Sequence, residues 1–116
     1  MSRPDELEEW EADALASWIE TYKKAMTTPV LLRLIATHQP VAAGALAELI
    51  PERTGWTLTE RGLYRTLKRF ETQGLLSHTT APAARTGAAR KDFSLTPVGA
   101  RHLASIEEQI ARTTER

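Results

Sequence analysis

The sequence of 116 residues contains no cysteine, so it can form neither disulfide bonds nor thiolate metal sites. This absence fits a reducing compartment, and we expect a cytoplasmic protein. The N-terminal stretch "MSRPDELEEWEAD" has neither the basic nor the apolar region of a signal peptide. Apolar runs long enough to cross a membrane are also missing, so the sequence predicts no membrane association.

Signs of catalysis or of a bound cofactor are equally scarce. The histidines, His38, His78 and His102, do not have the spacing of metal ligands. The acidic residues lie on predicted helix surfaces without a partner histidine or nucleophile, and no glycine-rich phosphate loop is present. The sequence therefore predicts a protein without enzymatic activity, metal or cofactor.

The chain has no net charge, with 15 basic and 15 acidic side chains, but these charges are unevenly distributed. Residues 1–26 carry seven acids and three bases, a net charge of −4, whereas residues 53–91 carry eight bases and two acids, a net charge of +6. Because local charge decides what a surface attracts, the second segment is the candidate for binding an anionic partner.

Helical periodicity dominates the first third of the chain. Residues 5–26 predict a long amphipathic helix, since apolar residues recur with the i, i+3, i+4, i+7 pattern. These residues are Leu7, Trp10, Ala14, Leu15, Trp18, Tyr22 and Met26. We expect the helix to stop near Thr27, and a second helix, capped by Thr28 with Pro29 in its first turn, to reach about His38.

Two further helices are expected before the middle of the chain ends. A short third helix should span about 42–50 and stop at Pro51, which cannot continue a helix. The fourth helix should begin at Thr57, which has capping-box spacing to a glutamate, or at Thr59, a rival N-cap. It should end at Gly74, a residue type favoured just beyond helix C-termini.

A β-hairpin and a last helix complete the predicted order. The segments "LLSHTT" and "KDFSLT" predict two strands joined by the loop "APAARTGAAR", and Thr96 should cap a helix over about 97–113. Three helices followed by a hairpin form a winged helix-turn-helix. We predict a mainly α (α+β) fold with an added N-terminal helix (1–27), a winged helix-turn-helix domain (28–96) and a C-terminal helix (97–116).

The fourth helix separates into two opposite faces when it is drawn at about 100° per residue. One face is apolar and consists of Leu63, Leu67 and Phe70. The opposite face is basic and consists of Arg61, Arg65 and Lys68, flanked by Tyr64 and Arg69. The first face predicts burial, and the second predicts a surface that either is simply solvated or contacts an anion.

Such a helix fits the major groove of DNA. Arginine can bridge O6 and N7 of guanine, whereas lysine and tyrosine more often hold phosphate oxygens. The N-terminal part of the second helix in a helix-turn-helix contacts base edges; here it carries Thr59, Glu60, Arg61 and Arg65. Glu60 either stabilises its own helix or accepts a hydrogen bond from a cytosine, and Arg65 either reads a base or holds a phosphate.

The predicted hairpin adds a second group of cations after this helix. Its loop and second strand carry Arg85, Arg90 and Lys91, a composition suited to phosphates or an adjacent minor groove. A basic helix followed by a basic wing favours double-stranded DNA as the partner over a solvated surface.

Two stretches resemble the PadR family of winged-helix transcriptional regulators. "GLYRTLKRFETQGLL" (62–76) is similar to the family's Ser-Leu-Tyr and Gly-Leu-Ile/Leu pattern, and "ARKDFSLTPVG" (89–99) is similar to its wing signature. "PVLLRLIATHQPVAAGALAELI" (29–50) fits the opening helices more loosely. The resemblance covers about residues 29–104, and the two motifs in this order are fairly specific.

The resemblance implies a homodimeric DNA-binding regulator, most often a repressor, with Tyr64 on the DNA backbone and both Arg90 and Lys91 in the DNA-facing wing. The sequence departs from the family at Ala45, where the family has tyrosine, and at Arg65, where it has proline. It also departs at Asp92, which replaces the first wing aromatic and adds a negative charge to the wing.

In the family this sequence resembles, the C-terminal helix builds the dimer. Here Leu103, Ile106 and Ile110 form a narrow apolar seam suited to a partner helix. The aromatic side of the N-terminal helix, with Trp10, Trp18 and Tyr22, packs either across the dimer or within its own domain. The tryptophans could instead hold a small aromatic effector, as in some related regulators, although such residues are more often core.

These expectations combine into one functional prediction. The chain is predicted to be a sequence-specific, homodimeric repressor that places the 57–74 helix in the major groove of a palindromic operator and the 77–91 wing on the backbone or minor groove. The alternative is a winged-helix module that binds protein rather than DNA, with the acidic N-terminal helix as its contact surface.

Overall fold

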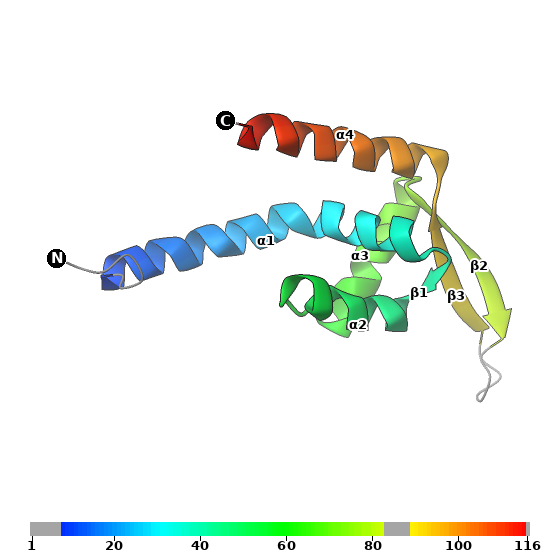
Figure 1. Cartoon of the computed structure of the whole chain (residues 1–116). Helices are drawn as coiled ribbons and strands as arrows, with labels where there is room; N and C mark the ends of the chain where they lie inside the picture. The colour runs from blue at the N-terminus through cyan, green and yellow to red at the C-terminus, as the bar shows by residue number, and fades with distance from the viewer. Residues whose placement is uncertain (1–7, 83–88, 116) are drawn as a thin grey trace.

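The computed structural model describes residues 8–82 and 89–115 of the chain. The elements follow in the order α1 (Glu9–His38), β1 (Val41–Ala42), α2 (Ala43–Thr54), α3 (Glu60–Thr72), β2 (Leu76–Pro82), β3 (Ala89–Leu95) and α4 (Pro97–Thr114). Four helices lie to one side of a small antiparallel sheet with strand order β1-β3-β2 (Figure 1). The predicted mainly α winged helix-turn-helix is confirmed.

The two N-terminal helices expected from the sequence are one continuous helix, α1, so the predicted stop at Thr27 is wrong. The Thr27 hydroxyl donates to the carbonyl of Lys23 at 2.7 Å, as threonine does inside a helix. Pro29 lies in the helix interior and is buried, as are Leu31, Leu32, Leu34 and Ile35 after it. Burial of this last segment outweighs the local tendency of proline to interrupt the helix.

Helix α2 is longer than expected because it passes through Pro51 to Thr54. Gly55 then ends it in the left-handed conformation (φ 75°), and its N–H donates to the Pro51 carbonyl at 2.7 Å. The predicted stop at Pro51 is therefore wrong by one turn. Strand β1, which pairs Val41 with Phe93, was not predicted, because two residues are too short to show alternation.

Helix α3 confirms Thr59 as the N-cap: its side-chain oxygen accepts a hydrogen bond from the Gly62 N–H at 3.0 Å. The predicted capping box that begins at Thr57 is not formed, since Glu60 is the first helical residue and not the third. Gly74 follows the helix with φ 78°, as expected for the residue after a helix C-terminus.

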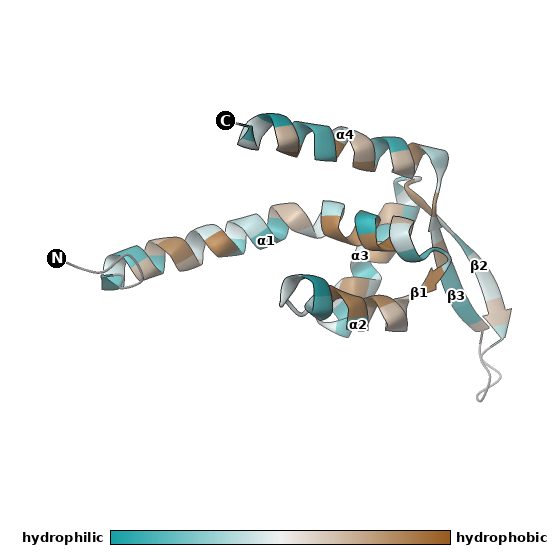
Figure 2. Cartoon of the chain, viewed as in Figure 1, coloured by the Kyte–Doolittle hydropathy of each residue, from teal (hydrophilic) through white to brown (hydrophobic). Residues whose placement is uncertain are grey.

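A single core holds these elements together. It contains apolar side chains from every helix and every strand: Leu31, Leu32, Leu34, Ile35, Val41, Ala43, Leu46, Ile50, Leu63, Leu67, Phe70, Leu75, Leu76, Phe93 and Leu103. Figure 2 shows hydrophobic residues where α1, α2 and α3 face one another, and further ones along the part of α1 that extends beyond them. Among the described helices, none is long and apolar enough to cross a membrane.

Helix α4 joins the domain at a point of very close approach. Thr96 caps it by accepting from the Gly99 N–H at 2.9 Å, and its own hydroxyl donates to the Gly74 carbonyl at 2.6 Å. A Cβ on Gly99 would lie 2.0 Å from the carbonyl oxygen of Leu75, so only glycine fits there. Further along, Arg33 of α1 pairs through two hydrogen bonds with Glu107 of α4, which fixes α4 alongside α1.

Candidate nucleic-acid interface

The recognition helix candidate, α3, presents its two predicted faces as expected. Leu63, Leu67 and Phe70 are almost fully buried. The exposed residues of the helix are Glu60, Arg61, Tyr64, Arg65, Lys68, Arg69 and Thr72. The helix is therefore anchored by its apolar face, and the cations stand on the side away from the core.

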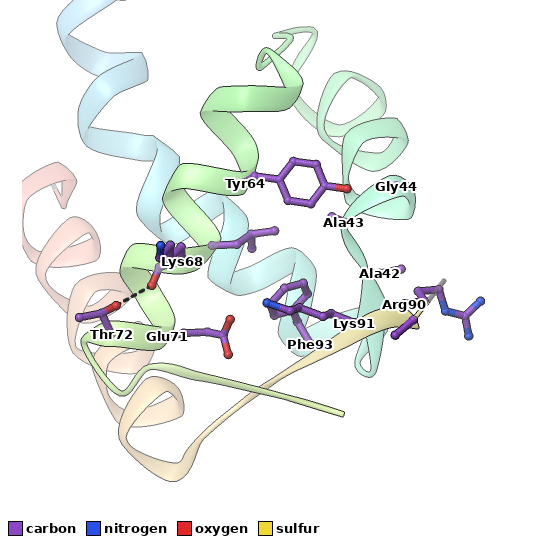
Figure 3. A pocket seen from close by; sticks show the side chains of 12 residues that line it. Ala42, Ala43, Gly44, Tyr64, Lys68, Glu71, Thr72, Arg90, Lys91 and Phe93 are labelled. Carbon is purple, nitrogen blue, oxygen red and sulfur yellow. Dashed lines mark hydrogen bonds between the residues drawn. The ribbon is translucent and has the colours of Figure 1, made fainter. Parts of the chain in front are cut away.

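An open groove of about 920 Å³ lies between α3, the start of α2 and the wing. Helix α3 contributes Tyr64, Leu67, Lys68, Glu71 and Thr72, and the wing contributes Ala89, Arg90, Lys91 and Phe93. Small residues, Ala42, Ala43 and Gly44, form the remaining wall. Figure 3 shows Tyr64 and Lys68 on α3 and Lys91 on the facing strand. The groove is thus lined by three cations, Lys68, Arg90 and Lys91, and by one carboxylate, that of Glu71.

The structure divides the predicted DNA-contacting residues into groups. Tyr64 and Lys68 line the groove, and Lys91 faces them from β3 (Figure 3). Arg61, Arg65 and Arg69 are exposed on α3 but do not line the groove. Thr59 sits at the N-terminus of α3, where its hydroxyl oxygen already caps the helix. Arg85 lies outside the described residues.

Arg90 and Lys91 point in different directions, although the sequence grouped them together. Successive side chains of a strand point to opposite faces, and Figure 3 shows the Arg90 side chain directed away from α3. Arg90 instead pairs with Asp92, with 3.1 Å between Nε and Oδ1. The two cations therefore offer charge to different sides of the wing.

A contact between Glu71 and His78 was missed by the sequence analysis. The carboxylate of Glu71, in the last turn of α3, lies 2.5 Å from Nδ1 of His78 on β2. The His78 ring also meets Phe93 edge-on, with 6.0 Å between ring centroids. These contacts tie the wing to the end of α3 and so help to fix the width of the groove. The only signal in the sequence was the tight turn at Gly74, which brings the two segments together.

The residues predicted for a dimer interface lie in different environments. Trp10 and Trp18 are 69% and 58% exposed on the projecting part of α1. Tyr22 stacks on Trp18 at 5.0 Å between centroids and meets Trp56 edge-on at 5.7 Å. On α4, Leu103 is buried in the core of its own chain, whereas Ile106 and Ile110 are half-buried.

Within residues 8–82 and 89–115, no group of three histidine, aspartate or glutamate side chains could hold a metal ion. Hydrogen bonding to Glu107 raises the pKa of the Arg33 guanidinium, but that pair connects α1 to α4 and lies outside the groove. The groove offers three cations against the one carboxylate of Glu71, together with a phenol and apolar surface, and this excess of positive charge suits binding of an anion.

Comparison with known proteins identifies the family. Residues 31–105 match the model of the transcriptional regulator PadR-like family. A PadR family transcriptional regulator from Eggerthella lenta DSM 2243 has 22% identity and a TM-score of 0.76, over 88% of this chain and 87% of the other.

A PadR-like transcriptional regulator from Bacillus cereus strain ATCC 14579 has 18% identity and a TM-score of 0.70, over 81% of this chain and 89% of the other. Such identities show a shared fold. Among curated proteins, none matches the chain. The family match covers more than half of the sequence, and the winged helix with its basic groove agrees with it: the chain belongs to the PadR-like family of transcriptional regulators.

Proposed function

We propose that the chain is a sequence-specific DNA-binding repressor that acts in the cytoplasm as a homodimer on a palindromic operator. Helix α3 enters the major groove, and the wing contacts the backbone or the adjacent minor groove. The observation that carries the proposal is the basic groove, in which Tyr64 and Lys68 of α3 face Lys91 of the wing. Membership of a family of transcriptional regulators supports it.

The position of each side chain on α3 determines whether we expect it to contact phosphates or bases. Lys68 and Tyr64, inside the groove, hold phosphates and set the register of the helix on DNA. Arg61 and Arg65 are exposed on the N-terminal half, the part of a recognition helix that contacts base edges. Glu60, at the first helical position, stabilises the helix through the dipole.

Salt-dependent binding tests this function. The affinity for duplex DNA should fall steeply between about 50 and 200 mM salt, because each neutralised phosphate releases counterions. The double variant Arg65→Ala/Lys68→Ala should lose most of the binding. A matched control, Lys24→Ala/Arg112→Ala, removes the same charges from exposed sites on α1 and α4 and should bind as the parent does. Unchanged DNA binding by the first variant, with folding preserved, would contradict the assignment of α3.

Homodimerisation is part of the same proposal. The projecting part of α1 exposes Trp10, Leu15 and Trp18, and exposed aromatic surface of this kind marks interaction sites. Ile106 and Ile110 of α4 add an apolar seam. Sedimentation should give the mass of two chains, and selected DNA fragments should contain two half-sites about one helical turn apart.

Two features favour further candidate partners at the same helix. The Trp18–Tyr22 stack leaves an exposed aromatic face on which a small aromatic effector could lie. The exposed acids of α1 would serve a protein partner if the winged helix binds protein rather than DNA. A salt-independent response, or no binding to any promoter DNA, would favour that second function.

A further inference from the structure

The outer face of the wing carries one ion pair within a single strand. Arg90 and Asp92 lie two residues apart on β3, so their side chains share a face. Two contacts join them: Nε to Oδ1 at 3.1 Å and Nη2 to Oδ2 at 3.4 Å. The guanidinium therefore meets the carboxylate in the side-by-side arrangement that arginine also uses for phosphate.

The residues paired with Arg90 and Asp92 on the neighbouring strands carry no charge that could compete for either side chain. Across the hairpin, Arg90 faces Ala81 and Asp92 faces Thr79, and on the other side Asp92 faces Ala42 of β1. None of these three paired neighbours in the described strands is charged. The Asp92 side chain is 18% exposed and that of Arg90 is 55% exposed, so the carboxylate is partly shielded while the arginine can still leave it.

The pair lies where a wing approaches DNA. Arg90 is one pair away from the last described rung of the hairpin, Pro82 opposite Ala89, and it borders the groove. Because Arg90 lines the groove, its guanidinium can bind a phosphate there only if it separates from Asp92. In the observed arrangement it is held by its own chain.

We propose that Asp92 is an internal competitor for phosphate that holds Arg90 and so weakens the grip of the wing on DNA of any sequence. This inference rests on the proposed DNA binding. Phosphate contacts contribute almost all of non-specific affinity, so one contact fewer leaves relatively more of the recognition to α3. Asp92 is thus a specificity-determining residue that need not touch a base.

A four-variant comparison tests the competitor directly. Affinity is measured for the parent, Asp92→Asn, Arg90→Ala and the double variant on a short duplex of mixed sequence, across a salt series. Asp92→Asn keeps the shape and removes the charge; it should bind about fivefold tighter, with a salt slope steeper by about 0.9, because one more phosphate is neutralised. Arg90→Ala in the parent should change affinity less than about twofold, since that arginine is already engaged.

The double variant separates the two effects of the carboxylate. If Asp92 acts through Arg90, the gain from Asp92→Asn should fall below about twofold when Arg90 is alanine. An equal gain with and without Arg90 would mean plain repulsion of phosphate, and a loss of affinity in Asp92→Asn would mean that Asp92 positions Arg90 for DNA; either overturns the proposal.

Two controls complete the test. Glu108→Gln makes the same change of charge at the exposed Arg112–Glu108 pair of α4, where Nη2 and Oε1 are 3.1 Å apart, and should leave the affinity unchanged. Thermal unfolding should confirm that all variants are folded, because an exposed ion pair contributes at most about 1 kcal/mol. Absence of DNA binding by the parent and Asp92→Asn alike would overturn both this proposal and the proposed function, whereas parental binding with no effect of Asp92→Asn would overturn this proposal alone.

Discussion

The two halves of α1 belong to one helix but differ completely in their surroundings. From Pro29 onward the helix contributes five buried residues to the core. Before Thr27 it projects from the domain (Figure 1) and leaves Trp10, Leu15 and Trp18 exposed. The first half looks at least as amphipathic in sequence as the second. Amphipathicity therefore predicts that a face will be covered, but not by what. Within the described residues, Tyr22 near the end of the projecting half packs against Trp56, whereas Trp10 and Trp18 stay largely exposed.

The largest effect should come from removing core volume in the packed half. Leu32 is 0% exposed, and Leu32→Ala should lower the free energy of unfolding by about 2–5 kcal/mol through lost burial and a residual cavity. Leu15→Ala is the matched control, since Leu15 is 47% exposed in the projecting half. It should cost less than about 0.5 kcal/mol under conditions where the chain is monomeric. Equal losses in urea denaturation would mean that the halves do not differ as described.

Replacing the proline between the two halves of α1 should raise the free energy of unfolding. Proline inside a helix costs about 3 kcal/mol relative to alanine, mainly through a missing N–H and a steric conflict. Pro29 is buried, so Pro29→Ala also loses some packing, and we expect a net gain of about 1 kcal/mol. Thermal denaturation checks this, and a lower midpoint would show that packing of the proline ring outweighs the backbone effect.

A smaller effect is expected where the packed half holds α4. Glu107→Gln removes the charge that pairs with Arg33, whose side chain is 43% exposed. The loss of stability should be about 0.5–1 kcal/mol, discounted for solvent screening, and should shrink at high salt. Glu108→Gln, at the more exposed pair with Arg112, is the control and should have almost no effect. A loss independent of salt would indicate lost hydrogen bonds and not lost charge attraction.

The smallest effect on the monomer should come from the aromatic end of the projecting half. Trp18 is 58% exposed and touches Tyr22, so Trp18→Ala should lower the free energy of unfolding of the isolated chain by less than about 1 kcal/mol. Its effect on self-association, measured by sedimentation, should be much larger if this half meets a second copy. An unchanged dimer constant would assign association to α4 alone.

Much of the fold and site followed from the sequence because the responsible signals are local. The Thr59 and Thr96 caps, the glycine after α3 and the two faces of that helix depend on residues within a few positions of one another. The predicted helix end before Pro29 was wrong because burial of the following segment outweighs the local effect of proline. The predicted end at Pro51 was wrong by one turn, since Gly55 and not the proline ends α2. Strand β1 could not be predicted because it forms by pairing with β3, and Phe93, the partner of Val41, lies 52 positions away in the sequence.

The candidate site shows the same division. Its basic residues were identified from their spacing in the sequence, but the faces to which their side chains point were not. The sequence placed Arg90 and Lys91 together, while the strand sends them to opposite faces and gives Arg90 to Asp92. Likewise the tie between Glu71 and His78 required the turn that brings α3 and β2 together.

The sequence by itself determined that the helical segments are helical and the two hairpin strands extended, which face of α3 is buried, and that basic residues gather on that helix and its wing. Those properties depend on short-range periodicity, capping and local charge. Tertiary structure alone decided where α1 continues, which half of it is covered, and which cations remain free to meet an anion. Burial and ion pairing depend on residues that folding brings together from distant parts of the chain, so they cannot be predicted from local sequence patterns.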